Sequence, residues 1–407
     1  MYKIINSKYI YCPVMGLLEN RSLLLKSNKI LKIDHKNKFK DLNYKKINLN
    51  ESIIIPGLIN SHIHLELNWV HKKLREYKNF PEWLNQIIDL KKNNLNKNVI
   101  KKSIKDAIIS SIKSGVTTIG QISSYNGIDI PIINKYGIRC CYFYEIANSN
   151  KDNFIKNLKV IERRLIKKNL ISIGIFPHSI YSLDTKIWET IISICKKKGY
   201  ITSTHLSESR DEVQFIKGND NKFDNLIFQK LISTPNIYRR KSFSPLKYLK
   251  YINFLDLNPT LVHMNNLSNE DKDIVKKNNL RIIICPRSNV FLKEKLPDLE
   301  FMLNYDLTGL GTDGLSSNHD LNIINEMYFL YKKAKKLKIK NLKEKILYIA
   351  TLGGAKCLGI DNQVGSIQEN KKADLIGFKI TQKNPLNSIL YDGGKNINLR
   401  MIDGKII

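Results

Sequence analysis

The sequence has few cysteines, and none of them is paired at the spacing of a metal knuckle or a redox motif. No two of the six are separated by two residues, which excludes a thiolate zinc knuckle and a thioredoxin-type site. Scattered cysteines in a chain of 407 residues are typical of a reduced, cytoplasmic enzyme. Residues 1–16 lack a signal-peptide pattern and no apolar run is long enough to cross a bilayer, so we expect no membrane partner.

Acidic residues are scarce relative to basic ones. The chain has 37 Asp and Glu residues against 67 Lys and Arg, which gives a formal net charge of +30. The basic residues are spread in short clusters and aromatic residues do not interleave with them, so we expect no nucleic-acid partner. The net charge makes nucleic-acid binding the alternative class of function. A weaker consequence of the same electrostatic field is the attraction of an anionic small substrate.

Short β-branched runs alternate with longer helical patterns through the middle of the chain. Eight candidate strands are mostly continuous apolar runs, as in strands buried on both faces: 53–65, 115–123, 138–146, 171–179, 201–207, 259–264, 280–288 and 307–313. Helical patterns lie between or after them, at 80–114 (long enough for two helices), 151–169, 184–199, 211–233, 268–278, 318–337 and 342–358, with a further short helix within 238–257. Eight alternating units indicate an α/β fold, a (β/α)8 TIM barrel with parallel strands.

Both ends of the chain differ from this middle part. Residues 1–50 and 363–407 contain short strands with turns, and the latter includes candidate strands at 374–380 and 398–401. We predict that the two ends pair into one small β-sandwich domain. It would lie beside a metal-dependent barrel formed by residues 51–362.

Two histidines stand at the end of the first predicted barrel strand. Side chains alternate along a strand, so His62 and His64 face the same way, into the mouth of the barrel. His205 and Asp313 end the fifth and eighth strands, although Asp313 alone could also cap a turn. Three imidazoles and a carboxylate suit a divalent metal ion, zinc or iron(II), with one position left for water. No lysine ends the fourth strand, which argues against a carboxylated lysine between two metals and indicates one metal ion.

Further polar residues follow other predicted strands at the same mouth. His263 ends the sixth strand, where it is either a fifth ligand or, preferably, a residue that hydrogen-bonds the bound water or a developing oxyanion. Glu208 lies three residues past His205 and is a candidate general acid/base, or else a solvated loop charge. His178 ends the fourth strand and either contacts the substrate or is a structural histidine.

Eight short motifs occur in order along nearly the whole chain. They are PGLINSHIHLELN (56–68), FPHSIYS (176–182), HLSESRDEV (205–213), LVHM (261–264), CPRSN (285–289), GTDGLSSN (311–318), ATLGGAKCLG (350–359) and GSIQENKKADLI (365–376). Together they resemble the amidohydrolase superfamily, and within it the deaminase and chlorohydrolase branch. The resemblance implies a metal-dependent aminohydrolase on a (β/α)8 barrel with a small β-sandwich made from both chain ends.

The resemblance also implies roles for the residues at matching positions. Glu208 is similar to the acid/base of the branch's HxxE motif, and His263 to the residue that orients the bound water. Asp313 would both hold the metal and accept a proton. The implied ligands of a single metal ion, zinc being favoured, are His62, His64, His205 and Asp313. Because this set is complete, a non-catalytic relative that keeps only the fold is the weaker alternative.

Residues of the implied substrate pocket are His178, Ser288 and Asn289. The run CPRSN (285–289) departs from the NPxSN of many relatives. With FPEWL (80–84), it is most similar to the aminodeoxyfutalosine deaminases of menaquinone biosynthesis, which act on an adenine nucleoside bearing a carboxyphenyl group. The implied reaction is 6-amino-6-deoxyfutalosine to futalosine. The alternatives are an S-adenosylhomocysteine or methylthioadenosine deaminase, and then guanine deaminase or a chlorohydrolase.

The implied partner is a free nucleoside, and a homodimer stays open. A carboxylate on this nucleoside needs a cation or several hydrogen bonds when it is buried. Arg287 is favoured because it lies in the motif that departs from the wider family, and a structural salt bridge is its alternative. The full set of candidate cations expected over the barrel mouth is Lys72, Lys73, Arg75, Arg210 and Arg287.

Overall fold

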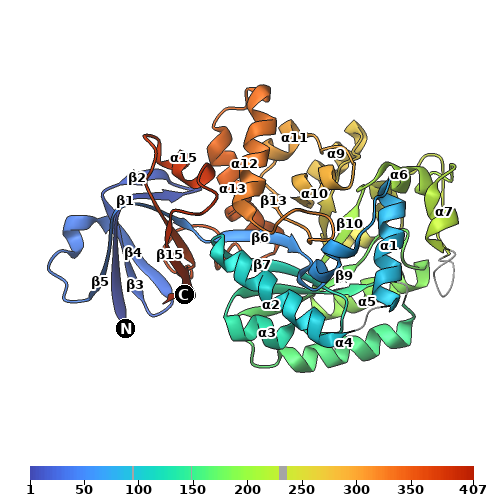
Figure 1. Cartoon of the computed structure of the whole chain (residues 1–407), viewed down its shortest axis with the longest axis horizontal. Helices are drawn as coiled ribbons and strands as arrows, with labels where there is room; N and C mark the ends of the chain where they lie inside the picture. Colours follow the sequence, from blue (N-terminus) through green and yellow to red (C-terminus); the bar gives the residue numbers. More distant parts are fainter. Residues whose placement is uncertain (94–95, 148, 229–235) are drawn as a thin grey trace.

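A barrel with a separate sheet at its side forms the architecture of the computed structural model (Figure 1). The structure describes residues 1–93, 96–147, 149–228 and 236–407. The N-terminal strands and the last strands of the chain lie together in the second sheet, and the barrel occupies the remainder.

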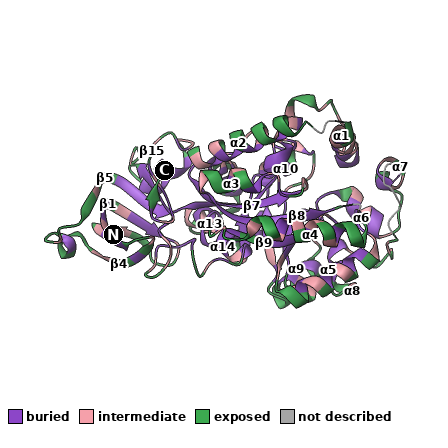
Figure 2. Ribbon diagram, turned by 90° about the horizontal axis from the view of Figure 1, so that it is seen from below, coloured by how far each residue is buried: buried purple, intermediate pink, exposed green. Residues whose placement is uncertain are grey.

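Eight parallel strands in the described part of the chain form the barrel sheet, each hydrogen-bonded to the next in chain order. They are β6 Leu58–Ile63, β7 Val116–Ser123, β8 Arg139–Ile146, β9 Ile171–Pro177, β10 Ile201–Leu206, β11 Thr260–His263, β12 Arg281–Ile284 and β13 Thr308–Leu310. All residues of β6, β7 and β8 are buried, as expected for strands covered on both faces. In Figure 2 the strands are largely buried, and exposed residues lie mainly on the surrounding helices and loops.

Hydrogen bonds just beyond the strand ladder join the first strand to the last. The Asn60 side chain donates to Thr312 Oγ1 (2.8 Å) and accepts from the Thr312 N–H (3.1 Å). The Asp313 N–H donates to the carbonyl oxygen of His62 (3.1 Å). These bonds close the ring of strands and bring a predicted metal ligand on β6 beside another after β13. The predicted (β/α)8 barrel is confirmed.

Helices surround the barrel, and many of them begin where a polar side chain caps the first turn. Asp184 accepts from the Lys186 N–H, and Ser268 forms a capping box with Asp271. The described α-helices are α1 Phe80–Asn93, α2 Lys97–Lys113, α3 Ile130–Tyr136, α4 Lys151–Leu165, α5 Thr185–Lys198, α6 Arg210–Ile216, α7 Lys222–Leu226, α8 Pro245–Tyr251, α9 Asn269–Lys277, α10 Pro286–Phe291, α11 Leu299–Asn304, α12 Ile323–Ala334, α13 Leu342–Ile349, α14 Leu352–Cys357 and α15 Pro385–Leu390. Short 3₁₀ segments add η1 Lys36–Phe39, η2 Leu65–Lys73, η4 Phe254–Leu257 and η5 Lys335–Leu337.

The second sheet combines both chain ends, as predicted. Its central strand β5 pairs in parallel with β1 and antiparallel with β14. Arg139, which begins barrel strand β8, forms a buried ion pair with Asp374 (2.8 Å) just before β14, and this pair ties the sheet to the barrel. The strands of this sheet are β1 Tyr2–Cys12, β2 Gly16–Glu19, β3 Arg21–Lys26, β4 Lys29–His35, β5 Lys45–Pro56, β14 Leu375–Lys379, β15 Ile397–Ile402 and β16 Lys405–Ile406. The predicted boundary after residue 50 falls inside β5, and the domain limits stay predictions.

Three predicted elements differ from the structure. The strand predicted at 53–65 is divided between β5 and β6 at Gly57, where an added Cβ would lie 2.0 Å from the Thr117 hydroxyl oxygen. The helix predicted at 342–358 breaks at Thr351 into α13 and α14, and Gly353 then packs so close that a Cβ would lie 2.2 Å from the Thr308 carbonyl oxygen. The helix predicted at 211–233 is replaced by α6 and α7, and its residues 229–233 lie outside the described residues.

Candidate active site

Three histidines and one aspartate converge at the mouth of the barrel. His62 lies on β6, His64 directly follows it, and His205 lies on β10. One ligand nitrogen from each histidine lies within 4.8 Å of the other two, and Nε2 of His205 is 3.3 Å from Nε2 of His62. Oδ1 of Asp313, three residues past β13, lies 3.5 Å from Nε2 of both His62 and His64. Four residues from three strands thus point at one small volume.

The protonation states of these side chains fit a cation at their centre. Burial lowers the pKa of each of the three histidines, that of His64 to about 4, so the imidazoles are neutral. A neutral imidazole offers a lone pair on one of its nitrogens, and lone pairs that converge at 3.3 Å call for a shared cation. Burial raises the pKa of Asp313, but its contacts with His62, His64 and His263 hold it well below its usual range. The donor set therefore fits a divalent metal ion of the zinc type.

The second carboxylate oxygen of Asp313 is fixed by two hydroxyl groups. Ser288 Oγ donates to Oδ2 at 2.8 Å, and Ser317 Oγ donates to the same oxygen at 2.5 Å. These bonds leave Oδ1 directed at the histidines. Asp313 is thereby held in one orientation before any ligand binds.

Glu208 and His263 form a second pair beside this cluster. Glu208 Oε1 lies 3.4 Å from His263 Nε2, and His263 Nδ1 lies 3.0 Å from Asn289 Oδ1. The amide orientation of Asn289 is set by its Nδ2, which donates to Asn265 Oδ1 (2.7 Å). An amide oxygen only accepts, so His263 Nδ1 carries the proton and Nε2 is bare. Burial, together with the charges of Asp313 and other acids, raises the pKa of Glu208 well above its usual value, so Glu208 is protonated and faces an acceptor.

The backbone around Glu208 is held by another buried carboxylate. Glu212 accepts from the N–H groups of Ser207 (3.0 Å) and Glu208 (2.8 Å). Positive φ angles occur at Ser207 (51°), His263 (76°) and Asp313 (58°), which are unusual for residues other than glycine. Such strain gathers at functional sites, where the surrounding bonds impose it.

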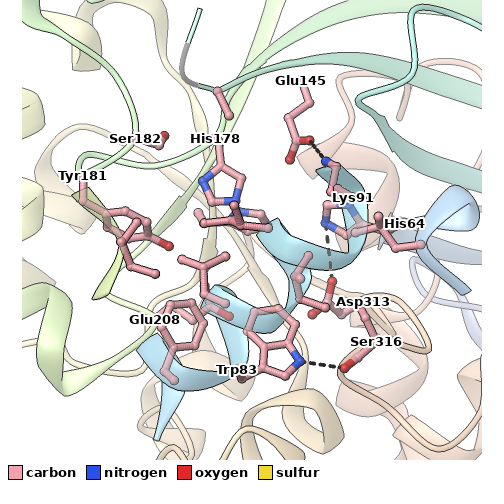
Figure 3. Close-up of a pocket in the computed structure, with 18 of the residues that line it drawn as sticks. His64, Trp83, Lys91, Glu145, His178, Tyr181, Ser182, Glu208, Asp313 and Ser316 are labelled. Carbon is pink, nitrogen blue, oxygen red and sulfur yellow. Dashed lines mark hydrogen bonds and ion pairs between the residues drawn. The ribbon is translucent and has the colours of Figure 1, made fainter. Parts of the chain in front are cut away.

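A cavity with about 990 Å³ of empty space, open mouth included, lies over these residues (Figure 3). One side of the cavity is polar and is lined by His64, His178, His205, Glu208 and Asp313. These residues, together with the fully buried His62 and His263 that pack against them, are called here the floor. The other side, called here the α1 wall, is the apolar face of one helix. Its residues follow a spacing of three to four positions, which places them on one face of α1: Phe80, Trp83, Leu84, Ile87 and Ile88. Trp83 Nε1 donates to the Ser316 carbonyl oxygen (2.8 Å) and so attaches α1 to the loop that carries Asp313.

The residues predicted to contact substrate lie in two places. His178 lines the cavity, with burial lowering its pKa to about 4. Ser288 and Asn289 lie behind the floor, where they bind Asp313 and His263. Arg287 is paired in bidentate fashion with Asp320 (2.9 and 2.8 Å), as the salt-bridge alternative expected. Arg287, Ser288 and Asn289 are not among the described residues that line the cavity, because α10 turns them toward protein partners. Their contact with substrate stays a prediction.

The sequence did not indicate the α1 wall or three charged residues that line the cavity, Lys91, Lys92 and Glu145. Lys91 follows the apolar face of α1 in its last turns, and Glu145 lies near the end of β8. Glu145 could have been found by the reasoning that found His178, since both are polar residues at strand ends. Lys91 gave no comparable signal, because its position depends on how α1 crosses the barrel mouth.

Comparison with known proteins places the chain in a family. Residues 53–407 match the profile of the amidohydrolase family, and the chain belongs to that family. A 5-methylthioadenosine/S-adenosylhomocysteine deaminase of Clostridium tetani is 26% identical over 370 residues, 87% of this chain and 80% of that protein. An aminodeoxyfutalosine deaminase of Nitratiruptor sp. is 28% identical over 331 residues, 80% of this chain and 78% of that protein. The predicted membership in this superfamily is confirmed, and the chain is an enzyme with deaminases among its relatives.

Solved structures confirm the fold. A zinc-bound adenosine deaminase of Xanthomonas campestris matches with a TM-score of 0.85 at 19% identity, covering 99% of this chain and 92% of that one. The aminofutalosine deaminase of Helicobacter pylori in complex with methylthio-coformycin matches with a TM-score of 0.85 at 23% identity, covering 100% of both chains. Among the helices that the structure describes, none has the length and apolar character needed to cross a membrane.

Proposed function

We propose that this enzyme deaminates an adenine nucleoside by hydrolysis at C6 of the ring, and that the nucleoside is 6-amino-6-deoxyfutalosine. The observation that carries the proposal is that one cavity joins the metal-ligand cluster and Glu208 to a long apolar wall. The floor can activate water and protonate a ring nitrogen. The wall can cover an aryl substituent on the far side of the ring.

The floor residues divide the chemistry among them. A divalent metal ion held by His62, His64, His205 and Asp313 would supply a Lewis acid that lowers the pKa of water toward neutrality. Protonated Glu208 donates to N1 of the adenine, which makes C6 electrophilic. His263 Nε2, left bare by the contact with Asn289, accepts a hydrogen bond from the attacking water and orients it.

Asp313 moves a proton from the attacking water to the leaving group. Asp313 Oδ1 accepts a proton from the attacking water, while its Oδ2 stays bound to two serine hydroxyls. As the C6–N bond breaks, the amino group leaves as ammonia with the proton that Asp313 passes on. The hydroxyl group at C6 returns its remaining proton to Glu208 as the C6=O bond forms. Water supplies the oxygen at C6, and the product is a hypoxanthine nucleoside. Zinc is the metal we propose, with iron(II) as the alternative.

The choice of substrate rests on the α1 wall together with the resemblance of FPEWL (80–84) and CPRSN (285–289). Five apolar side chains on one helix face offer a surface that fits the phenyl ring of a carboxyphenyl group. The Nitratiruptor relative and the Helicobacter pylori structure carry names of this activity. A methylthioadenosine or S-adenosylhomocysteine deaminase is the second candidate. An apolar wall also suits a thioether, and several relatives carry that name.

The test is a panel of substrates assayed by ammonia release from metal-loaded enzyme. The panel contains aminodeoxyfutalosine, methylthioadenosine, S-adenosylhomocysteine, 5′-deoxyadenosine, adenosine and guanine. We expect the highest kcat/KM for aminodeoxyfutalosine. A higher value for methylthioadenosine or S-adenosylhomocysteine would replace the first candidate with the second. Activity on guanine alone would contradict the choice of an adenine nucleoside.

A further inference from the structure

An ion pair that the chemistry does not use lines the same cavity. Lys91 Nζ, from α1, lies 3.8 Å from Glu145 Oε2, from β8 (Figure 3). The Glu145 side chain is only 5% exposed, whereas that of Lys91 is 31% exposed. Burial raises the pKa of Glu145, but Lys91, His178 and His64 hold it below its usual value, and the side chain lines the cavity. Burying a charged group costs free energy, and both members of this pair line the cavity.

The pair is held in place by a polar network beneath it. Lys91 Nζ donates to Ser124 Oγ at 2.9 Å and lies 5.4 Å from the centre of the Tyr125 ring. The Ser124 hydroxyl donates to Glu66 Oε1 at 2.8 Å, and the Ser124 N–H donates to the same oxygen. Glu66 is buried, so its partner is fixed by the barrel interior. The ammonium of Lys91 therefore has a defined position at the cavity edge.

The hydrogen-bonding capacity of the pair selects the kind of ligand. An ammonium has three donors and a carboxylate has about four acceptor sites, so the contacts above leave each with capacity to spare. An anion at Lys91 would be repelled by Glu145, and a cation at Glu145 would be repelled by Lys91. A vicinal diol is neutral, donates to a carboxylate and accepts from an ammonium. A vicinal diol therefore fits the Lys91–Glu145 pair better than an anion or a cation does.

We propose that Lys91 and Glu145 bind the 2′- and 3′-hydroxyl groups of the ribose and make the enzyme selective for ribonucleosides. This inference rests on the proposed deamination of an adenine nucleoside. Glu145 accepts from a hydroxyl group and Lys91 donates to its neighbour. The ring is thereby held with C6 toward the floor and the 5′ substituent along the α1 wall.

The experiment compares adenosine with 2′-deoxyadenosine and 3′-deoxyadenosine, which share the same reacting ring. Hydrogen bonds to charged groups predict that kcat/KM of the wild type is about 10- to 100-fold higher for adenosine. Glu145→Gln and Lys91→Met should each lower kcat/KM for adenosine and for the deoxynucleoside that keeps the hydroxyl bound by the altered residue. The other deoxynucleoside should be nearly unaffected, so for each variant one of the two ratios approaches one. Ammonia release gives the rates, and metal content and thermal unfolding show that the variants are folded.

Glu82→Gln is the matched control, because Glu82 lies at the other end of α1 and binds Asn79 and the Lys78 N–H. It should keep the wild-type ratios. The inference is overturned if wild type does not prefer adenosine, or if both cavity variants keep the wild-type ratios. The wild-type ratios decide alone if neither variant folds. Failure of the proposed function looks different: no adenine nucleoside then releases ammonia from the metal-loaded wild type.

Discussion

The floor and the α1 wall of one cavity are built in opposite ways. The floor comes from the ends of several strands, and its polar groups are fixed by partners such as Ser288 on Asp313 and Asn289 on His263. The wall comes from a single helix and presents apolar side chains with almost no polar contact, Trp83 Nε1 excepted. This difference indicates that the residues that carry out the reaction and the residues that select the substrate lie on separate elements. Variants of the floor should therefore affect every substrate, and variants of the wall only some.

The largest effect is expected from the centre of the floor. His62→Ala removes one of four converging ligands, so we expect loss of the bound metal and of activity on every substrate. Elemental analysis and ammonia release measure the two losses together. His35→Ala, an exposed histidine of the terminal sheet, is the control and should keep both. A His62→Ala protein with a full equivalent of metal would remove His62 from the ligand set.

Glu208→Gln should separate metal binding from turnover. Gln has nearly the same shape but cannot deliver the proton to the ring, and such groups contribute ~10²–10⁴-fold to rate. We expect a wild-type metal content with a loss of this size in kcat for all adenine nucleosides. Near wild-type turnover would transfer the acid role to another residue, with His263 the first candidate.

A variant of the α1 wall should lower kcat/KM for some substrates more than for others, unlike a variant of the floor. Ile87 is 4% exposed and lines the cavity. Ile87→Ala removes apolar contact with the 5′ substituent, for which we expect roughly a tenfold loss in kcat/KM on aminodeoxyfutalosine. The loss on adenosine, which has no such group, should be smaller. Val99→Ala, at an exposed position of α2, is the control for loss of an apolar side chain from a helix. An equal loss on both substrates would mean that Ile87 acts through the fold.

The smallest selective effect is expected from Arg287. Its guanidinium is already paired with Asp320, so Arg287→Ala should lower kcat/KM about equally for aminodeoxyfutalosine and for methylthioadenosine. The Asp320 side chain is 40% exposed, which limits the contribution of that ion pair to stability to about 1 kcal/mol or less. Arg287 Nη1 also lies 3.7 Å from Oε1 of the fully buried Glu326, so the variant should lower the unfolding temperature as well. Thermal unfolding and the two kcat/KM values check this. A loss confined to the carboxylated substrate would indicate that Arg287 contacts the carboxylate of the substrate.

The floor could be predicted from the sequence because each of its residues ends a strand or follows one by a few positions. In a parallel barrel all these ends meet at one mouth, so His62, His205 and Asp313 converge although they are far apart in the chain. The partners behind the floor could not be assigned in this way. Ser288 and Asn289 also follow a strand, but α10 turns them back onto Asp313 and His263.

The α1 wall and the Lys91–Glu145 ion pair could not be predicted from the sequence for a related reason. The spacing along 80–91 predicts which residues of α1 share a face, but not what that face covers. The position of Lys91 is fixed by Ser124 and Glu66, which come from other segments of the chain. Side-chain periodicity carries no information on such long-range contacts.

The most direct measurement follows the oxygen of the product. Metal-loaded enzyme is incubated with aminodeoxyfutalosine in isotopically labelled water, and the product is examined by mass spectrometry alongside ammonia release. Hydrolysis at C6 predicts one labelled oxygen in the purine and one ammonia for each product formed, and both should vanish after the metal is removed by a chelator. An unlabelled purine, or full activity without metal, would contradict metal-dependent hydrolytic deamination.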